Sequence, residues 1–254
     1  MVWRAIVRSS IGTSHQKRQI PCQDYGQYLI ANDLVIGAVA DGAGSARYAE
    51  VGAELAVKTA LFNLDAWVKR NKVFLPIAEL EARVLFSWVL ATIVTELKAE
   101  AASRGCLLSD MACTLMTFIA APGWIAAAQV GDGFIVTGCR ANQYQLLFQP
   151  TKGEFINETT FVTAANAEQE MQVCVRLEEQ TFLCVATDGL ERVALQLQEW
   201  LPFARFFQPL QDFMWTTSSP EQEDEYICNF LTSERLNART DDDKTLLLCV
   251  YDRP

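Results

Sequence analysis

The stretch VIGAVADGAGS, residues 35–45, joins a run of small apolar residues directly to a carboxylate and two glycines. An uninterrupted apolar run of this length is typical of a strand that is buried on both faces. Asp41 stands where that strand would end. Taken alone, Asp41 and Gly42 form a common turn dipeptide, and Asp41 is also suited to capping a following helix.

The same pattern recurs along the chain. Asp188 follows the apolar run FLCVAT, Asp132 follows WIAAAQVG, and Asp242 stands just before the apolar run TLLLCVY. Carboxylates that converge at one end of a sheet repel one another unless cations lie among them. Ligation by oxygen atoms suits hard cations such as Mg²⁺ or Mn²⁺, and the single histidine of the chain argues against zinc or copper.

Alternating and continuous apolar runs predict a chain rich in strands, several of them separated by short turns that indicate antiparallel hairpins. The predicted strands are residues 29–40, 114–120, 124–130, 134–138, 144–148, 171–176, 181–187 and 245–251. Amphipathic helices are predicted over residues 45–67 and 77–103, after Asp188, and from a capping box at residues 219–222, with Ser45 capping the first of them. These elements predict an α+β class, with helices packed outside antiparallel sheets, in one domain over residues 1–254.

Composition narrows the possible partners. The formal charge of −10 argues against a nucleic-acid or anionic membrane surface, which would require Lys and Arg. The N-terminal residues do not have the pattern of a secretion signal, and the apolar run 85–94 is too short to span a bilayer, so we expect a cytoplasmic protein. The eight cysteines occur singly, which argues against a disulfide framework or a zinc site.

Five motifs in order along the chain resemble those of the metal-dependent type 2C Ser/Thr protein phosphatase family, in particular its compact bacterial branch. The matching residues are Gly12-Thr-Ser-His15 with Cys22-Gln-Asp24, Val39-Ala-Asp41-Gly42-Ala-Gly44, Cys113-Thr-Leu115 with Val130-Gly-Asp132-Gly133, Ala186-Thr-Asp188-Gly189, and Asp242-Asp243-Lys-Thr245. The resemblance implies a four-layer α-β-β-α sandwich with a two-metal centre at one end of the paired sheets.

The resemblance also implies a set of metal ligands that all supply oxygen. The implied ligands are Asp24, Asp41, Gly42 through its carbonyl, Asp132, Asp188 and Asp242. Asp41 would bridge two Mn²⁺ or Mg²⁺ ions, Asp24 would lie by the second of them, and Asp132 would belong to a third, weaker ion. An activated water between the two ions would then attack the phosphorus of the substrate in line.

The sequence departs from the family pattern near the second metal and at the phosphate-binding arginine. Gln23 replaces an acidic residue, which removes a negative charge. Gln19 stands at the expected arginine position, so Arg18 is the candidate for phosphate binding, with a solvated surface arginine as the alternative. His15 is a candidate general acid or phosphate contact, with a strand residue bonded to a neighbouring loop as the alternative. Asp243 stands where the family often has Asn.

We therefore expect an enzyme that hydrolyses phosphoserine and phosphothreonine in proteins, opposed by a Ser/Thr kinase and acting as a monomer, with Asp41, Arg18 and His15 at the centre of catalysis. The alternatives are a phosphatase-fold module that binds phosphoproteins or regulates a kinase without catalysis, and a small-molecule phosphohydrolase. Residues 152–159 resemble a reduced flap beside the cleft or form an ordinary connection. The aromatic segment 200–215 is interpreted as buried core rather than a partner-binding face.

Overall fold

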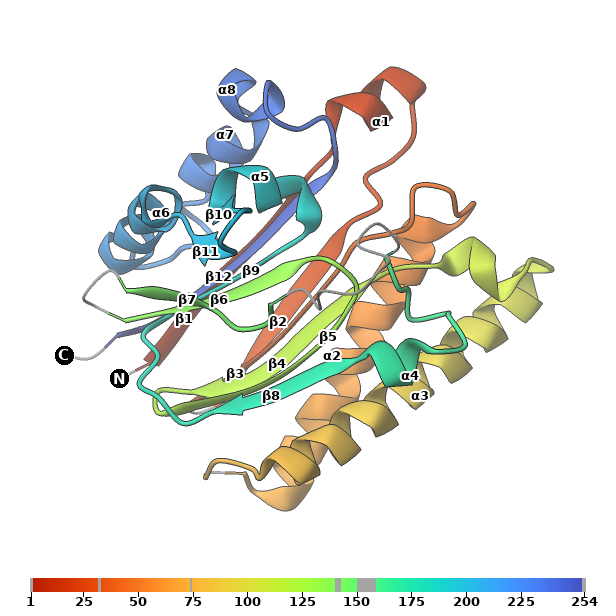
Figure 1. Ribbon diagram of the computed structural model, residues 1–254, viewed down its shortest axis with the longest axis horizontal. Coiled ribbons are helices and arrows are strands. Elements are labelled where there is room, and N and C mark those ends of the chain that lie inside the picture. Colours follow the sequence, from red (N-terminus) through yellow and green to blue (C-terminus); the bar gives the residue numbers. More distant parts are fainter. Residues whose placement is uncertain (1, 32, 74, 140–142, 150–158, 253–254) are drawn as a thin grey trace.

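The strands form two five-stranded antiparallel sheets that face each other (Figure 1). The computed structural model describes residues 2–31, 33–73, 75–139, 143–149 and 159–252. The first sheet consists, in spatial order, of β1 (Val2–Ser10), β12 (Lys244–Asp252), β9 (Phe182–Ala186), β6 (Phe134–Gly138) and β7 (Tyr144–Leu146). The second consists of β2 (Tyr25–Ala31), β3 (Leu34–Ala40), β4 (Leu115–Ala121), β5 (Trp124–Val130) and β8 (Gln172–Arg176).

Helices cover the outer face of each sheet (Figure 1). The second sheet carries α2 (Ala49–Asn71) and α3 (Glu79–Arg104), and the first carries α6 (Ala204–Thr216) and α7 (Glu225–Thr232). Separate clusters of buried apolar side chains fill the two helix–sheet interfaces and the interface between the sheets. The predicted four-layer α-β-β-α sandwich of the α+β class is therefore confirmed.

The apolar run that precedes Asp41 is explained by the position of β3 between two apolar layers. Ile36 and Ala38 belong to the cluster beneath α2 and α3, whereas Val35 and Val39 belong to the cluster between the sheets. Because successive side chains of a strand point to opposite faces, both faces must be apolar, and every residue of β3 is buried.

The prediction of one long strand over residues 29–40 was wrong. The chain reverses between Ala31 and Leu34, which pair with each other, so that β2 and β3 form a hairpin. The first strand, β1, was not predicted. Charged residues interrupt its apolar pattern, and one of them, Arg8, binds Glu221 and Asp224.

The helix predicted after Asp188 is mostly absent. The chain forms a 3-10 turn, η2 (Asp188–Leu190), a single turn of helix, α5 (Glu191–Ala194), and then a two-stranded hairpin of β10 (Leu195–Gln196) and β11 (Leu201–Pro202). Trp200 in the left-handed region, with φ 53°, reverses the chain in this hairpin. Strand pairing and burial therefore override the helical pattern of this segment.

Two predicted helix starts were also wrong. Residues 219–223 form a turn, in which the Gln222 and Glu223 amides donate to the Ser219 carbonyl, and α7 begins only at Glu225. Arg8 donates to the Glu221 carbonyl and thereby holds this turn outside the helix. Similarly, α2 begins after Tyr48, without a side-chain cap, so Ser45 does not cap it.

The aromatic segment 200–215 is buried only in part. The helix α6 buries Phe207, Leu210 and Met214 in the cluster beneath the first sheet, whereas Phe203 is exposed. All eight cysteines are free. None of the helices in the described ranges combines the length and the apolarity that crossing a membrane requires.

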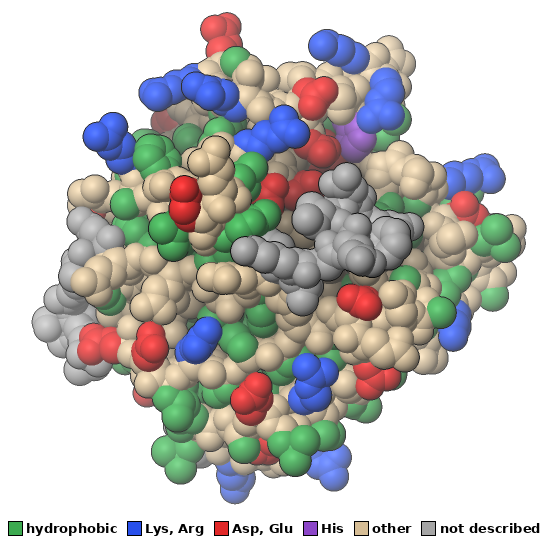
Figure 2. Space-filling model, viewed as in Figure 1, with side chains coloured by type: hydrophobic (Ala, Val, Ile, Leu, Met, Phe, Trp, Pro, Cys, Tyr) green, Lys and Arg blue, Asp and Glu red, His purple; other side chains and the backbone are tan. Residues whose placement is uncertain are grey.

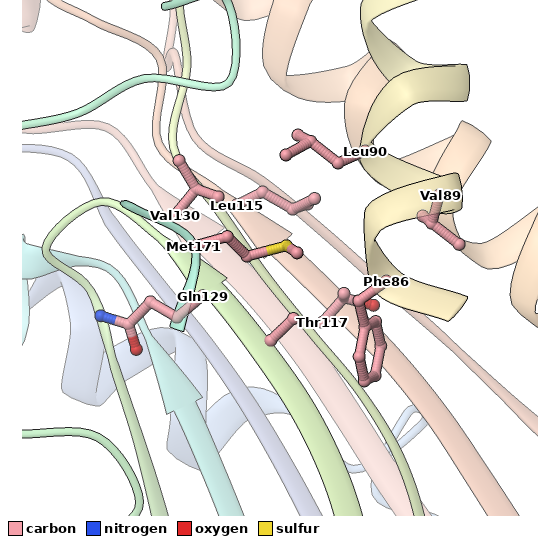
Figure 3. A pocket seen from close by; sticks show the side chains of 9 residues that line it. Phe86, Val89, Leu90, Leu115, Thr117, Gln129, Val130 and Met171 are labelled. Carbon is pink, nitrogen blue, oxygen red and sulfur yellow. The ribbon is translucent and has the colours of Figure 1, made fainter. Parts of the chain in front are cut away.

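The interface between α3 and the second sheet contains a small cavity of about 10 Å³, lined by Phe86, Leu115 and Met171 among others (Figure 3). This volume is at the lower limit for one water molecule, and the lining is mostly apolar. Gln129 turns its amide away from α3 and donates to the Gly131 and Gly133 carbonyls. The cavity is therefore a packing gap rather than a ligand site.

Gly52, in the first turns of α2, supports a stability prediction. A Cβ atom at this position would lie 2.2 Å from the Met111 carbonyl oxygen in η1 (Leu108–Met111). Alanine is favoured over glycine inside a helix by about 1 kcal/mol, but overpacking against a fixed backbone costs about 1–3 kcal/mol. We expect Gly52→Ala to lower the melting temperature measured by circular dichroism. Gly123→Ala, at an open turn with nothing within 4 Å, is the control and should leave it unchanged. An equal or higher melting temperature for Gly52→Ala would contradict this packing.

Candidate active site

A cleft of about 430 Å³ lies at one end of the two sheets, where loops from both sheets meet. Most of the residues proposed from the sequence line it. These residues are His15, Arg18, Asp41, Gly42, Asp132, Asp188 and Asp242. The cleft forms there because β3, β5 and β9 end at this edge and β12 begins at it. Asp24 does not line the cleft but lies buried behind it.

Asp41 is held from several sides. Its amide donates to Thr114 Oγ1 at 2.9 Å, and its carbonyl accepts from the Thr114 amide at 2.8 Å. The Gly42 amide donates to the Gln23 carbonyl at 3.1 Å. A Cβ atom at residue 42 would lie 2.8 Å from both the Gln23 carbonyl oxygen and the Ala49 Cβ, so only glycine fits without displacement. The backbone at Asp41 is consequently fixed before any ligand binds.

Asp24 is 6% exposed and is anchored through the first sheet. Its Oδ2 accepts from Thr187 Oγ1 at 2.8 Å, and the same hydroxyl accepts from the Thr245 amide at 2.9 Å. Its Oδ1 has no hydrogen-bond partner among the described residues. One carboxylate oxygen is therefore fixed and the other is left for a further partner.

The acidic residues destabilise one another in their charged forms. Burial raises the pKa of Asp41 well above its usual range, and repulsion from Asp24, Asp188 and Asp242 adds to this effect. Burial likewise raises the pKa of Asp24, and burial together with the neighbouring acids raises the pKa of Asp188 to about 6. Such a cluster is stable as carboxylates only if cations compensate its charge.

The residues present fit hard cations. The donors are oxygen atoms, and the buried Oδ1 atoms of Asp24 and Asp188 lack hydrogen-bond partners among the described residues. No group of three or more His, Cys, Asp and Glu side chains in the described ranges is placed to hold an ion by itself. Water and the Gly42 carbonyl would therefore have to complete the coordination, as is usual for Mg²⁺.

Asp243 was not among the predicted site residues, although it organises this end of the molecule. Its Oδ1 accepts from the Gly12 amide at 2.6 Å, and its Oδ2 accepts from the Gln23 amide at 2.6 Å and from His15 Nδ1 at 2.9 Å. Asp243 is 3% exposed and does not line the cleft. The available signal was its place in the fifth motif, where the neighbouring Asp242 attracted the metal-ligand interpretation.

His15 belongs to the short helix α1 (Thr13–Arg18), not to a strand. His15 as a whole is 4% exposed, yet it contributes to the wall of the cleft. Because Asp243 Oδ2 also accepts from a backbone amide, it acts as an acceptor toward the imidazole, and Nδ1 is the donor. The Nε2 atom is the ring nitrogen that Asp243 does not engage.

Arg18 is exposed at the end of α1 and reaches the same cleft. Its Nε donates to the Ser14 carbonyl at 3.3 Å. The chain then reverses through Gln19, which adopts the left-handed conformation with φ 56°. Gln23 is buried, and its side-chain oxygen has no partner among the described residues.

Asp132 is exposed and accepts a hydrogen bond from Thr159 Oγ1. Thr159 is the last residue of the segment interpreted as a reduced flap and itself lines the cleft. The remainder of that segment, residues 152–158, lies outside the described residues. The described contact joins the end of this segment to one of the candidate metal ligands.

The α-β-β-α architecture is that of solved bacterial serine/threonine phosphatases. The serine/threonine phosphatase of S. agalactiae matches with a TM-score of 0.66 at 18% identity, over 98% of this chain and 100% of that chain. RsbX in complex with magnesium matches with a TM-score of 0.57 at 13% identity, over 99% of this chain and 96% of that one. At these identities the structures establish the fold.

The sequence places the chain within this class. The family model described as protein phosphatase 2C matches residues 11–232. Serine/threonine-protein phosphatase 3 of Escherichia coli strain K12 is 34% identical over 259 aligned positions, which cover 99% of each chain. The chain belongs to the protein phosphatase 2C family.

The role of Asp243 leads to a stability prediction. Both of its oxygens accept hydrogen bonds, so Asp243→Asn would place an amide NH₂ against a donor. We expect a loss of about 1–3 kcal/mol in the free energy of unfolding, measured by urea denaturation. Asp241→Asn removes the same charge at an exposed neighbour and should have little effect. Equal stabilities of the two variants would contradict the proposed role of Asp243.

Proposed function

We propose that the protein is a Mg²⁺- or Mn²⁺-dependent phosphatase that hydrolyses phosphoserine and phosphothreonine in proteins. The observation that supports this most strongly is the convergence of Asp41, Asp188 and Asp242 in one cleft, beside buried carboxylate oxygens without partners among the described residues. Membership of the protein phosphatase 2C family and the 34% identity to a serine/threonine-protein phosphatase agree with it.

The cleft residues would hold two cations and, more weakly, a third. Asp41, the Gly42 carbonyl, Asp188 and Asp242 would hold the first, with Asp41 shared with a second beside Asp24. Asp132 would serve the third. When bound, such cations lower the pKa of a water molecule and neutralise phosphate charge.

The other cleft residues would position the substrate and move a proton. The Arg18 guanidinium would bind the phosphate through two parallel hydrogen bonds. Asp243 holds His15 Nδ1–H, so a doubly protonated imidazole would present its Nε2–H to the leaving oxygen of the serine or threonine. Both assignments come from the position of these side chains in the wall of the cleft.

Turnover of p-nitrophenyl phosphate with Mn²⁺ tests the proposal. We expect Asp41→Asn and Asp188→Asn each to lower kcat/KM by about a hundredfold or more, because each removes a charged ligand. Asp33→Asn is the matched control, since Asp33 is exposed in the turn between β2 and β3. Undiminished turnover in both cleft variants would refute the assignment.

The alternative is a module that keeps the fold and binds phosphoproteins without catalysis, and the neutral Gln23 is the feature that favours it. Calorimetric titration with Mn²⁺ separates the two. We expect the wild type to bind Mn²⁺ and Asp188→Asn to bind it at least about tenfold more weakly. An absence of both binding and turnover in the wild type would favour the module.

We also propose, on the family resemblance, that the substrate is a protein phosphorylated by an opposing Ser/Thr kinase. A cytoplasmic monomer, folded as one domain over residues 1–254, remains our prediction for the setting in which it acts. Sedimentation velocity would test the oligomeric state, and a dimer at micromolar concentration would contradict it.

A further inference from the structure

Basic side chains gather around the acidic cleft (Figure 2). Lys and Arg side chains lie over α1, α5 and α8 (Glu234–Asn237), and acidic side chains lie in the hollow between these helices. We call the exposed basic residues of this region the basic rim. The basic rim consists of Lys17, Arg18, Arg192, Arg235 and Arg239. This grouping is notable in a chain with a formal charge of −10.

The basic rim is attached to the same loops that carry the cleft acids. The Ser14 amide of α1 donates to the Asp241 carbonyl at 2.9 Å. The buried Lys244 Nζ donates both to Asn237 Oδ1 of α8 and to the Asp242 carbonyl. The helix α5 follows η2, and therefore Asp188, without a break. The segments that carry the rim residues are thus joined directly to the loops of the cleft and do not form an independent surface.

The charges of the basic rim are available for a partner. Arg8, Lys58, Lys69, Arg104 and His15 form ion pairs within the described ranges, and none of these pairs includes a rim residue. The helices α5 and α8 carry the acids Glu191 and Glu234, and the segment after α8 carries Asp241 and Asp242, of which Asp242 is a proposed metal ligand.

We propose that the basic rim binds acidic residues flanking the phosphorylated serine or threonine, so that the preferred substrates are acidic phosphorylated segments. This inference rests on the proposed phosphatase function. Like charges grouped around a cleft act through their summed field, which extends about 8–10 Å at moderate ionic strength. A segment that places its phosphate in the cleft would bring its flanking carboxylates within this distance of α1, α5 and α8.

Three phosphothreonine peptides of equal length test the inference. They carry Glu, Gln or Lys on both sides of the phosphothreonine, and kcat/KM is measured with Mn²⁺ at low ionic strength. We expect the Glu peptide to exceed the Gln peptide by about tenfold, the Lys peptide to be the poorest, and the preference to shrink as salt is added.

Rim variants connect the preference to the structure. In Arg192→Gln/Arg235→Gln/Arg239→Gln, the ratio of kcat/KM for the Glu and Gln peptides should fall toward one. Arg18 is left intact because it is a candidate phosphate ligand. The control is Arg70→Gln/Arg83→Gln/Arg176→Gln, which removes the same charge at exposed positions toward the other end of the sandwich and should keep the ratio.

A wild-type ratio at or below one, or an unchanged ratio in the triple rim variant, would overturn the inference. If the wild type hydrolyses no phosphorylated compound, the proposed function fails, and the rim is then tested by fluorescence anisotropy with the same peptides. Tighter binding of the Glu peptide that is lost in the rim variant would still support an acidic partner, whereas equal binding of the Glu and Gln peptides would exclude one.

Discussion

The arrangement of the molecule depends on the face-to-face packing of two sheets that are apolar on both sides. Because helices cover the outer faces and the sheets cover each other, the central strands have no face left for charged residues. Charged side chains are therefore confined to the ends of these strands, and β3, β5, β9 and β12 meet at one of these ends. The cleft is a direct consequence of this restriction.

Packing the acids at this edge carries an electrostatic cost that the fold itself does not offset. Asp24 and Asp41 are mostly buried, and their neighbours are other carboxylates. The hydrogen bonds of Asp41 with Thr114 and of Asp24 with Thr187 position these residues, but they do not neutralise their charge. A cluster of this kind, maintained by rigid backbone contacts, is more easily understood as a site prepared for cations than as a contribution to stability.

The structure could be predicted from the sequence in those segments whose conformation is set by a single physical requirement. The buried strands and the acids at their ends were predictable, since turn formation alone does not account for an apolar run that repeatedly ends in Asp-Gly. The structure of the segment after Asp188 was not predictable, because the pairing of β10 with β11 overrides its helical pattern. Asp243 was missed for a different reason: its role lies in hydrogen bonds to Gly12, Gln23 and His15, which are far from it in sequence and leave no local pattern.

The position of β12 has a consequence for the order in which this protein folds during its synthesis. β12 is the last strand along the described chain, yet it lies between β1 and β9 and is preceded directly by Asp242 and Asp243. During synthesis, β1 is made before the other described strands. It cannot pair with β12 until nearly all of the described chain has been made. The cleft is therefore incomplete in every nascent chain that lacks β12, and any hydrolytic capacity can arise only after this strand has been made.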